Sequence, residues 1–203
     1  MRLYFVRHGQ SEANVLQVIS NRDLPHPLTA TGREQAAQLA QSLADVRLAR
    51  IYASPILRAR QTAEIVSAAL GLPFEIADAL REPDCGEMEG RADEVAWAEH
   101  RRVTEAWLEA HDDDAHIEGG ESLNAVRARF APWLDRLAAE YAHTAESILI
   151  ITHGLLLYTM LSNILINADT VFAEWRPIPN TGTIIVEWTP AGWVGVEWCG
   201  VRL

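Results

Sequence analysis

The chain has 203 residues, of which 49% are apolar and 22% charged, enough apolar material for one large or two small domains with a sizeable core. Its 17 basic residues are all arginines and stand against 28 acidic residues, so the formal net charge is −11. This acidic balance disfavours nucleic acid and anionic membranes as general partners. The absence of lysine excludes a lysine Schiff base and a phosphate-binding loop that ends in Gly-Lys-Ser/Thr.

The cysteine content and the N-terminal sequence bear on the compartment. The two cysteines, Cys85 and Cys199, are too few for a disulfide framework or a CxxC zinc site, which favours a reducing environment. The N-terminal apolar run is shorter than the core of a signal peptide and is interrupted by Arg7. We therefore expect a cytoplasmic protein.

One apolar stretch, residues 147–166, is long enough to span a bilayer. His153 and Gly154 interrupt it, and a polar break without partners would be costly inside a membrane. We therefore interpret the stretch as a buried strand at 148–151 followed by a helix from about Leu155, and we expect no membrane association.

The first half of the chain alternates short apolar runs, typical of buried strands, with amphipathic segments typical of helices. Residues 3–6 and 50–53 predict strands. A capping-box pattern at Thr31 predicts the start of one helix. The Ser-Pro pair at 54–55 supplies an N-cap and a first-turn proline for a second helix, which Gly71 ends.

The second half continues the alternation. Residues 93–110 predict an acidic helix, and the apolar spacing of 121–141 predicts an amphipathic helix with a kink at Pro132. After the strand and helix of the 147–166 stretch, residues 183–188 and 193–198 flank a Pro-Ala-Gly turn and predict a hairpin.

Strands that alternate with helices imply a mostly parallel sheet covered on both faces. We expect an α/β fold, a three-layer α/β/α sandwich around a mostly parallel central sheet with a C-terminal hairpin. Repeats, low-complexity tracts and linkers are missing, so residues 1–203 are predicted to form a single domain. The Trp-rich hairpin offers a sheet edge at which two copies could pair, which leaves a homodimer open.

Two predicted strands end in a histidine, and ligands of such sheets bind at the carboxyl ends of the strands. The first strand is followed by Arg7 and His8, and the later buried strand by His153. The helix after the second strand carries Arg58 in its first turns. If these strands are neighbours, two imidazoles and two guanidinium groups converge beside helix N-termini, which predicts a phosphate site.

This predicted site suits covalent phosphoryl transfer. A neutral histidine has a ring nitrogen whose lone pair can attack phosphorus, and the surrounding positive groups would offset charge on the phosphoryl oxygens. The leaving alkoxide then needs a proton. Glu82, just after a short predicted strand, is the best candidate for the acid, with Glu87 and Glu89 as alternatives in the same loop.

Several sequence blocks occur in a characteristic order over nearly the whole chain. They are RHGQSEAN at 7–14, PLTATGREQA at 27–36, SPILRARQTA at 54–63, Glu82, GGES at 119–122 and THG at 152–154. Taken together, they make the chain resemble the histidine phosphatase superfamily, also called the phosphoglycerate-mutase-like family. Arg-His-Gly alone would be a weak signal, but the blocks in this order are a strong one.

The resemblance implies a role for each matched residue. His8 is the nucleophile that becomes phosphohistidine, and Glu82 protonates the leaving group and then activates water. The phosphoryl oxygens are held by Arg7, Arg58 and His153. Further phosphate or substrate contacts are implied for Gln10, Asn14 and Gly154. No metal and no cofactor are implied.

Each of these residues also has a purely structural interpretation. Gln10, Ser11 and Asn14 could cap a helix that begins there. Arg58 could be a surface residue in an ion pair, as we expect for Arg60. Each histidine alone could be a satisfied polar residue at a strand end, but their occurrence with both arginines favours catalysis.

The resemblance also implies that residues 83–120 form an acidic helical and loop cap over the active site. Within it, 93–118 carries nine acidic residues against two arginines, a formal charge of −7. Such a segment disfavours highly anionic substrates and favours those with a cationic or neutral body. Trp97 or Trp107 could line the mouth. The alternating His and Asp of 111–116 suggest a metal site, but such loops are more often solvated, so we predict no metal ligand there.

Two departures from the mutases of the family favour hydrolysis. Glu82 and His153 lie only 71 positions apart, whereas the mutases carry a longer insertion between the acid and the second histidine. Pro83 follows the acid, where the mutases carry an Arg-His-Tyr-Gly segment. We therefore predict a metal-independent phosphomonoesterase that acts on a small phosphorylated metabolite. A phosphoglycerate mutase and a non-catalytic module that binds a phosphorylated ligand remain the alternatives.

Overall fold

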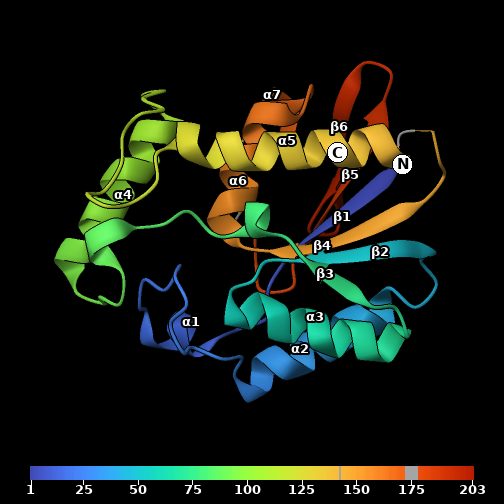
Figure 1. The fold of residues 1–203 in the computed structure, drawn as a ribbon, viewed down its shortest axis with the longest axis horizontal. Coiled ribbons are helices and arrows are strands. Elements are labelled where there is room, and N and C mark those ends of the chain that lie inside the picture. Colours follow the sequence, from blue (N-terminus) through green and yellow to red (C-terminus); the bar gives the residue numbers. More distant parts are fainter. Residues whose placement is uncertain (142, 172–177) are drawn as a thin grey trace.

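A mixed sheet runs through the centre of the computed structural model, which describes residues 1–141, 143–171 and 178–203. Seven strands of the described residues form it in the order β3-β2-β4-β1-β5-β6-β7 (Figure 1). Their bounds are β1 Arg2–Arg7, β2 Leu48–Ala53, β3 Phe74–Ile76, β4 Ser147–Thr152, β5 Thr183–Thr189, β6 Gly192–Trp198 and β7 Val201–Arg202.

Strands β3, β2, β4 and β1 are parallel, and the hairpin β5–β6 and the short β7 extend the β1 edge in antiparallel pairing. The α/β class and the C-terminal hairpin predicted from the sequence are confirmed. In the register of β1 with β4, Arg7 lies opposite Thr152. The two strands that precede the histidines are therefore immediate neighbours and end at the same level.

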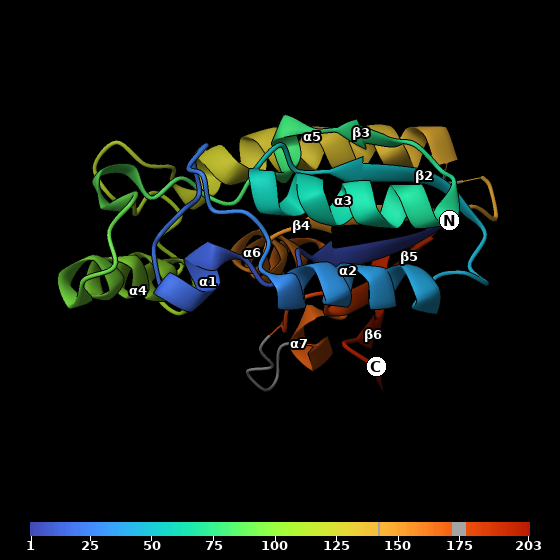
Figure 2. The same ribbon diagram turned by 90° about the horizontal axis from the view of Figure 1, so that it is seen from below.

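Helices cover both faces of the sheet (Figures 1 and 2). Helices α2 (Ala30–Ser42) and α3 (Leu57–Leu70) pack on one face, while α5 (Leu123–Tyr141) and α6 (Gly154–Ile164) pack on the other. Side chains alternate along β1 between the two faces, as the period of a strand requires. The core with α5 and α6 contains Leu3 and Phe5, whereas the core with α2 and α3 contains Tyr4 and Val6.

Two helix starts differ from their predictions. Helix α2 is capped by Thr29, whose side chain accepts a hydrogen bond from the amide of Gly32, so the capping-box prediction at Thr31 was wrong by two residues. Helix α3 begins at Leu57 with Ile56 as its N-cap instead of at the predicted Ser-Pro pair. The predicted end of α3 is confirmed, because Gly71 adopts the left-handed conformation at φ 65°.

The segment 83–120 lies beyond the carboxyl ends of the parallel strands, together with α1 (Glu12–Leu16) (Figures 1 and 2). It contains a 3-10 turn at Gly86–Met88 and helix α4 (Glu94–Leu108). The short helix α7 (Ala168–Val171) follows α6. None of the helices in the described ranges has the length and apolar character that a bilayer crossing requires.

Candidate active site

The two histidines predicted from the strand ends lie together. The ring centroids of His8 and His153 are 5.2 Å apart, and the rings are inclined by 61°. Both side chains are almost completely buried. This proximity follows from the pairing of β1 with β4, because each histidine is the residue directly after its strand.

The hydrogen bonds of His8 define its tautomer. Nε of Arg58 lies 2.8 Å from Nε2 of His8, and because a guanidinium only donates, Nε2 must accept. Nδ1 lies 2.7 Å from the carbonyl oxygen of Gly9, which only accepts, so Nδ1 carries the proton. Burial, followed by the charges of Arg58 and Arg7, lowers the pKa of His8 well below its usual value. His8 is thus a neutral imidazole whose Nε2 holds the lone pair.

Gly9, the residue after His8, allows the backbone of this loop to lie close to the backbone of α2. A Cβ on Gly9 would lie 2.5 Å from the carbonyl oxygen of Gly32, at the start of α2. The amide of Gly9 donates to the hydroxyl of Thr62, which itself donates to the carbonyl of Arg58. The loop that carries the nucleophile position is therefore held against both α2 and α3.

The two arginines differ in how they are held. Arg58 is 5% exposed, donates through Nη1 to the carbonyl of Ser20, and has its pKa lowered by burial to about 10. Arg7 donates through Nη1 to the carbonyl of Ile178, while no residue of the described part of the chain bonds its buried Nε. By contrast, Arg60 is exposed and lies 3.9 Å from Glu64, as predicted.

His153 lies beside His8 and is completely buried. Its Nε2 is 2.7 Å from the hydroxyl of Ser54, and within the described residues its Nδ1 has no hydrogen-bond partner. Burial, then the charges of Arg58 and His8, lowers the pKa of His153 well below its usual value. The orphaned Nδ1 and the orphaned Nε of Arg7 are buried polar groups, which are costly without a hydrogen-bonding ligand.

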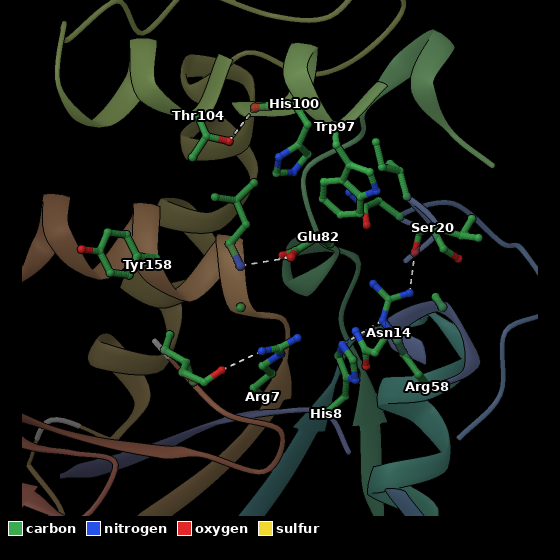
Figure 3. Close-up of a pocket in the computed structure, with 17 residues that line it drawn as sticks. Arg7, His8, Asn14, Ser20, Arg58, Glu82, Trp97, His100, Thr104 and Tyr158 are labelled. Atoms are coloured by element: carbon green, nitrogen blue, oxygen red, sulfur yellow. Dashed lines mark hydrogen bonds between the residues drawn. The ribbon is translucent and has the colours of Figure 1, made fainter. Parts of the chain in front are cut away.

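Glu82 is fixed by the N-terminus of α6. Its two carboxyl oxygens accept hydrogen bonds from the amides of Leu155 at 3.0 Å and Leu156 at 2.9 Å. Burial raises the pKa of Glu82, against the lowering effect of these amides and of Arg58. Figure 3 shows the carboxyl group above the His8 ring, with the guanidinium groups of Arg7 and Arg58 on either side of that ring.

The alternatives to Glu82 are placed differently. The carboxylate of Glu89 accepts hydrogen bonds from the amides of Asn21, Arg22 and Cys85. Glu87 is exposed and does not line the cavity around His8. Of the three acidic residues considered from the sequence, Glu82 alone faces the histidine.

A cavity of about 320 Å³ opens above these groups. Its lining includes the predicted residues Arg7, His8, Asn14, Arg58, Glu82 and Gly154. Gln10 and His153 are not among the lining residues: the side-chain oxygen of Gln10 accepts a hydrogen bond from Thr29, and His153 is fully buried beside His8. The Oδ1 of Asn14 accepts hydrogen bonds from the amide and hydroxyl of Ser11, so Asn14 both caps α1 and faces the cavity.

Sequence reasoning missed several residues that support the site. Asn180, which follows the undescribed residues 172–177, donates to the carbonyl of His8 and to Oδ1 of Asn14. Ser20 holds Arg58 through its backbone, and His100, Thr104 and Tyr158 line the cavity. Trp97, which was considered as a mouth residue, lines it too. Isolated polar residues such as Asn180 and Ser20 carry no spacing signal in one sequence.

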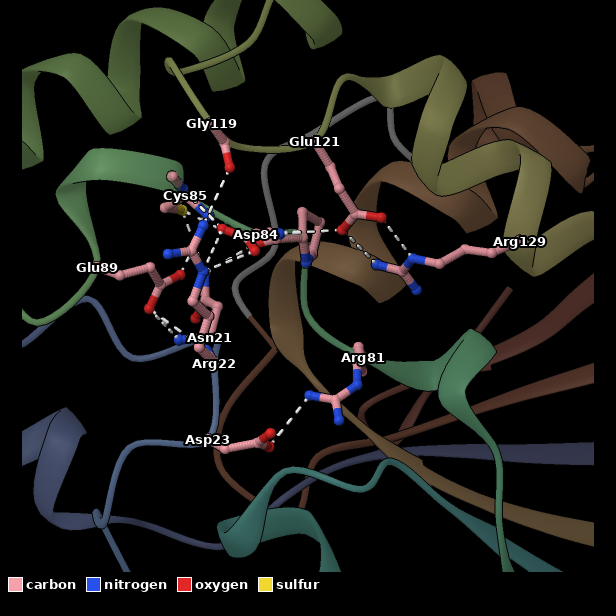
Figure 4. A network of polar contacts seen from close by, with 12 residues as sticks. Asn21, Arg22, Asp23, Arg81, Asp84, Cys85, Glu89, Gly119, Glu121 and Arg129 are labelled. Atoms are coloured by element: carbon pink, nitrogen blue, oxygen red, sulfur yellow. Dashed lines mark hydrogen bonds and ion pairs between the residues drawn. The ribbon is translucent and has the colours of Figure 1, made fainter.

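The loop after Glu82 is held by a network of ion pairs and hydrogen bonds (Figure 4). The Glu121 carboxylate accepts the amide of Asp84 at 3.0 Å and two donors of Arg129 at 2.8 and 2.9 Å. Arg22 binds the carboxylate of Asp84 and the carbonyl of Gly119. The GGES block therefore fixes the segment that follows the acid, a role that the sequence did not define.

Polar groups of the 111–116 loop contact one another and helix α5. Asp113 pairs with Arg127 at 3.0 Å, and a ring nitrogen of His116 lies 2.8 Å from the carbonyl of Asp114. Among residues 1–141, 143–171 and 178–203, no group of three or more His, Cys, Asp or Glu side chains is arranged to hold a metal ion.

Comparison with known proteins gives the family. The model of the histidine phosphatase superfamily (branch 1) matches residues 3–200. The probable phosphoglycerate mutase GpmB of Proteus mirabilis is 31% identical in an alignment of 202 residues that covers 98% of this chain and 90% of that protein.

Two solved phosphatase structures share the fold over nearly their full length. The alpha-ribazole phosphatase of Shigella flexneri has 28% sequence identity and a TM-score of 0.78, covering 100% of this chain and 98% of that chain. A mycobacterial glucosyl-3-phosphoglycerate phosphatase has 25% identity and a TM-score of 0.81, covering 97% and 98%. On these matches, the chain belongs to the histidine phosphatase superfamily.

Proposed function

We propose that this protein is a metal-independent phosphomonoesterase that hydrolyses a small phosphorylated metabolite through a phosphohistidine on His8. The observation that carries the proposal is the neutral His8 ring, with its lone pair on Nε2, facing Glu82 across a cavity flanked by two arginines. A binding module would need the arginines but neither a poised nucleophile nor a carboxyl group opposite it.

The first step transfers the phosphoryl group to the protein. Nε2 of His8 attacks phosphorus while the bond to the ester oxygen breaks, and Glu82 gives its proton to that oxygen. Arg58 exchanges its hydrogen bond to Nε2 for one to a phosphoryl oxygen, and Arg7 and Nδ1 of His153 supply further donors. The Nδ1–H bond to Gly9 stabilises the positive charge that the His8 ring acquires.

The second step returns both residues to their starting states. Glu82, now a carboxylate, takes a proton from water, whose oxygen attacks phosphorus as the bond to Nε2 breaks. Inorganic phosphate leaves, and His8 is neutral again. The raised pKa of Glu82 suits a group that acts first as acid and then as base. The arginines supply the positive charge that a metal ion provides in other phosphoryl-transfer sites.

The second candidate is a phosphoglycerate mutase, which the 31% identity to GpmB favours. The two reactions share the first step and differ in whether water or a second hydroxyl accepts the phosphoryl group. We expect free phosphate from p-nitrophenyl phosphate and from members of a metabolite panel, and none with His8→Asn. Isomerised phosphoglycerate that depends on a bisphosphate primer, without phosphate release, would assign the mutase reaction instead.

A further inference from the structure

A second cavity of about 810 Å³ adjoins the one above His8. The two cavities share Trp97, His100, Thr104 and Tyr158 as lining residues, so they lie next to each other along α4 and α6. We call the second one the distal cavity; its other lining residues are Arg101, Glu105, Trp107, Leu108, Glu109, His111, Asp113, Ser162 and Asn163. The first cavity contains His8 and the two arginines, and the distal cavity lies beside it.

One face of α4 borders both cavities. Trp97, His100, Thr104 and Leu108 recur every three or four residues, the spacing at which side chains share a face of a helix. Figure 3 shows Trp97, His100 and Thr104 of this face above Glu82, with Tyr158 of α6 on the other side. A substrate whose phosphoryl group lies at His8 would therefore extend its leaving group between α4 and α6.

The walls of the distal cavity are suited to a ring. Trp97 and His100 make an edge-to-face contact with ring centroids 5.2 Å apart, and Tyr158 lies on the opposite helix. The indole nitrogens of Trp97 and Trp107 donate to the backbone carbonyls of Gln17 and Ala115, which fixes both indoles. Fixed aromatic side chains offer apolar surface at a low entropic cost of binding.

The charge of the distal cavity is opposite to that of the phosphate site. Three carboxylates line it, Glu105, Glu109 and Asp113, against the guanidinium of Arg101. Asp113 is paired with Arg127, whereas no ion pair of the described residues includes Glu105 or Glu109. His100 adds no compensating charge, because burial lowers its pKa. With Asp113 paired, the exposed carboxylates of Glu105 and Glu109 outnumber Arg101, so the distal cavity is net negative, whereas Arg7 and Arg58 make the cavity at His8 positive.

We propose that the distal cavity binds the leaving group of the substrate and selects a ring-bearing body that is uncharged or positively charged over one that carries a carboxylate. This inference rests on the proposed phosphomonoesterase function. A phosphate ester of that class matches both cavities, whereas a carboxylate in the distal cavity would face Glu105 and Glu109.

The test uses three biphenyl-4-yl phosphates that differ only at the 4′ position, which bears an aminomethyl, a methyl or a carboxyl group. The second ring separates the substituent from the ester oxygen, so differences in kcat/KM report on binding of the body. We expect the order aminomethyl, methyl, carboxyl, with about a tenfold ratio between the first and last at low salt. The ratio should shrink as ionic strength rises.

Two variants of the distal cavity and one control variant test whether its carboxylates cause the selectivity. Glu105→Gln should lower the aminomethyl-to-carboxyl ratio about threefold, and Glu105→Gln/Glu109→Gln should lower it further. Glu99→Gln changes the net charge equally on the same helix, but Glu99 pairs with Arg102 and lines neither cavity, so the ratio should stay at its wild-type value.

The outcomes separate the two proposals. If the wild type releases phosphate from p-nitrophenyl phosphate but hydrolyses the three biphenyl esters equally or not at all, the distal-cavity inference is wrong and the phosphomonoesterase function stands. An unchanged ratio in the double variant also overturns the inference. If no phosphate is released from any ester, the proposed function itself fails.

Discussion

The Nε atom of Arg58 lies 2.8 Å from Nε2 of His8, so the lone pair that would attack phosphorus accepts a hydrogen bond from a guanidinium. The contact keeps the imidazole proton on Nδ1, so the lone pair lies on Nε2. This lone pair faces the guanidinium group that would bind a phosphoryl group. A phosphoryl group that took over the Arg58 donor would free Nε2 at the moment of binding. In the proposed mechanism, this one contact thus couples the nucleophile to the group that stabilises the phosphoryl charge.

Removing Arg58 should change both the acidity of His8 and the reaction rate. The charge of Arg58 lowers the pKa of His8, so Arg58→Ala should move that pKa upward, toward its usual value. Loss of the donor should lower kcat/KM by about 10²- to 10³-fold. NMR titration of the imidazole nitrogens and steady-state kinetics measure the two effects. Arg60→Ala is the control, because that exposed arginine lies two residues away on α3; equal losses in both variants would contradict the assignment.

Substitution of Glu82 should matter most for poor leaving groups. Glu82→Gln should reduce kcat/KM for an alkyl phosphate by about 10²- to 10⁴-fold, the usual contribution of a general acid. With p-nitrophenyl phosphate, whose leaving group needs no proton, the loss in the first step should be far smaller. Burst kinetics separate this step from the later hydrolysis. Equal losses of the first-step rate for both esters would show that Glu82 does not protonate the leaving group.

The directions of the two pKa shifts set the shape of the pH profile. Protonation of His8 removes the nucleophile, and because its pKa lies well below 6.5, the acid limb of kcat/KM should also lie below 6.5. Ionisation of Glu82 removes the acid, and because its pKa is raised above 4.5, activity toward alkyl phosphates should fall as pH rises through that raised value. In Glu82→Gln the alkaline limb should disappear, and a limb that persisted would belong to another group.

The sequence predicted the main strands well, because buried apolar runs are local signals, and it identified the histidines that directly follow two of them. That β1 and β4 are neighbours depends on the order of the strands in the sheet. No short stretch of the sequence determines that order. The start of α3 was misplaced for a related reason. The hydroxyl of Ser54 contacts His153, a residue 99 positions away, so the Ser-Pro pattern serves the site instead of the helix end.

The support around Glu82 could not be predicted at all. Its carboxylate is held by amides of α6, and the following loop is held by Glu121 and Arg129, which are 37 or more residues away from Asp84. Such long-range contacts leave no periodicity in the sequence. In the sequence, the GGES block was recognised only as a feature shared with the family. The hydrogen bonds of Glu121 to the Asp84 amide and to Arg129 show that it holds the loop after Glu82.

Breaking the Glu121–Arg129 pair should loosen the segment that carries the acid. Glu121→Gln removes the charge that Arg129 binds and weakens the contact to the Asp84 amide, and we expect a loss of roughly 1–3 kcal/mol in unfolding free energy. Because Glu82 would be less well placed, kcat for alkyl phosphates should fall more than kcat for p-nitrophenyl phosphate, with little change in KM. Equal loss for both esters would indicate a general structural effect, and Glu64→Gln in the exposed pair with Arg60 is the control.

Chelation tests the role assigned to the arginines. In the proposed mechanism Arg7 and Arg58 supply the positive charge at the phosphate site, so treatment with EDTA followed by dialysis should leave turnover of p-nitrophenyl phosphate unchanged. A loss of activity that a divalent cation restores would contradict the mechanism.

Trapping the intermediate tests the central claim most directly. The protein is mixed with a ³²P-labelled phosphomonoester, quenched in alkali within milliseconds, and analysed for protein-bound label. We predict an alkali-stable, acid-labile phosphoenzyme in the wild type whose label maps to His8, and none in His8→Asn. Label that persisted in His8→Asn, or rapid wild-type turnover without any labelled protein, would contradict covalent transfer through His8.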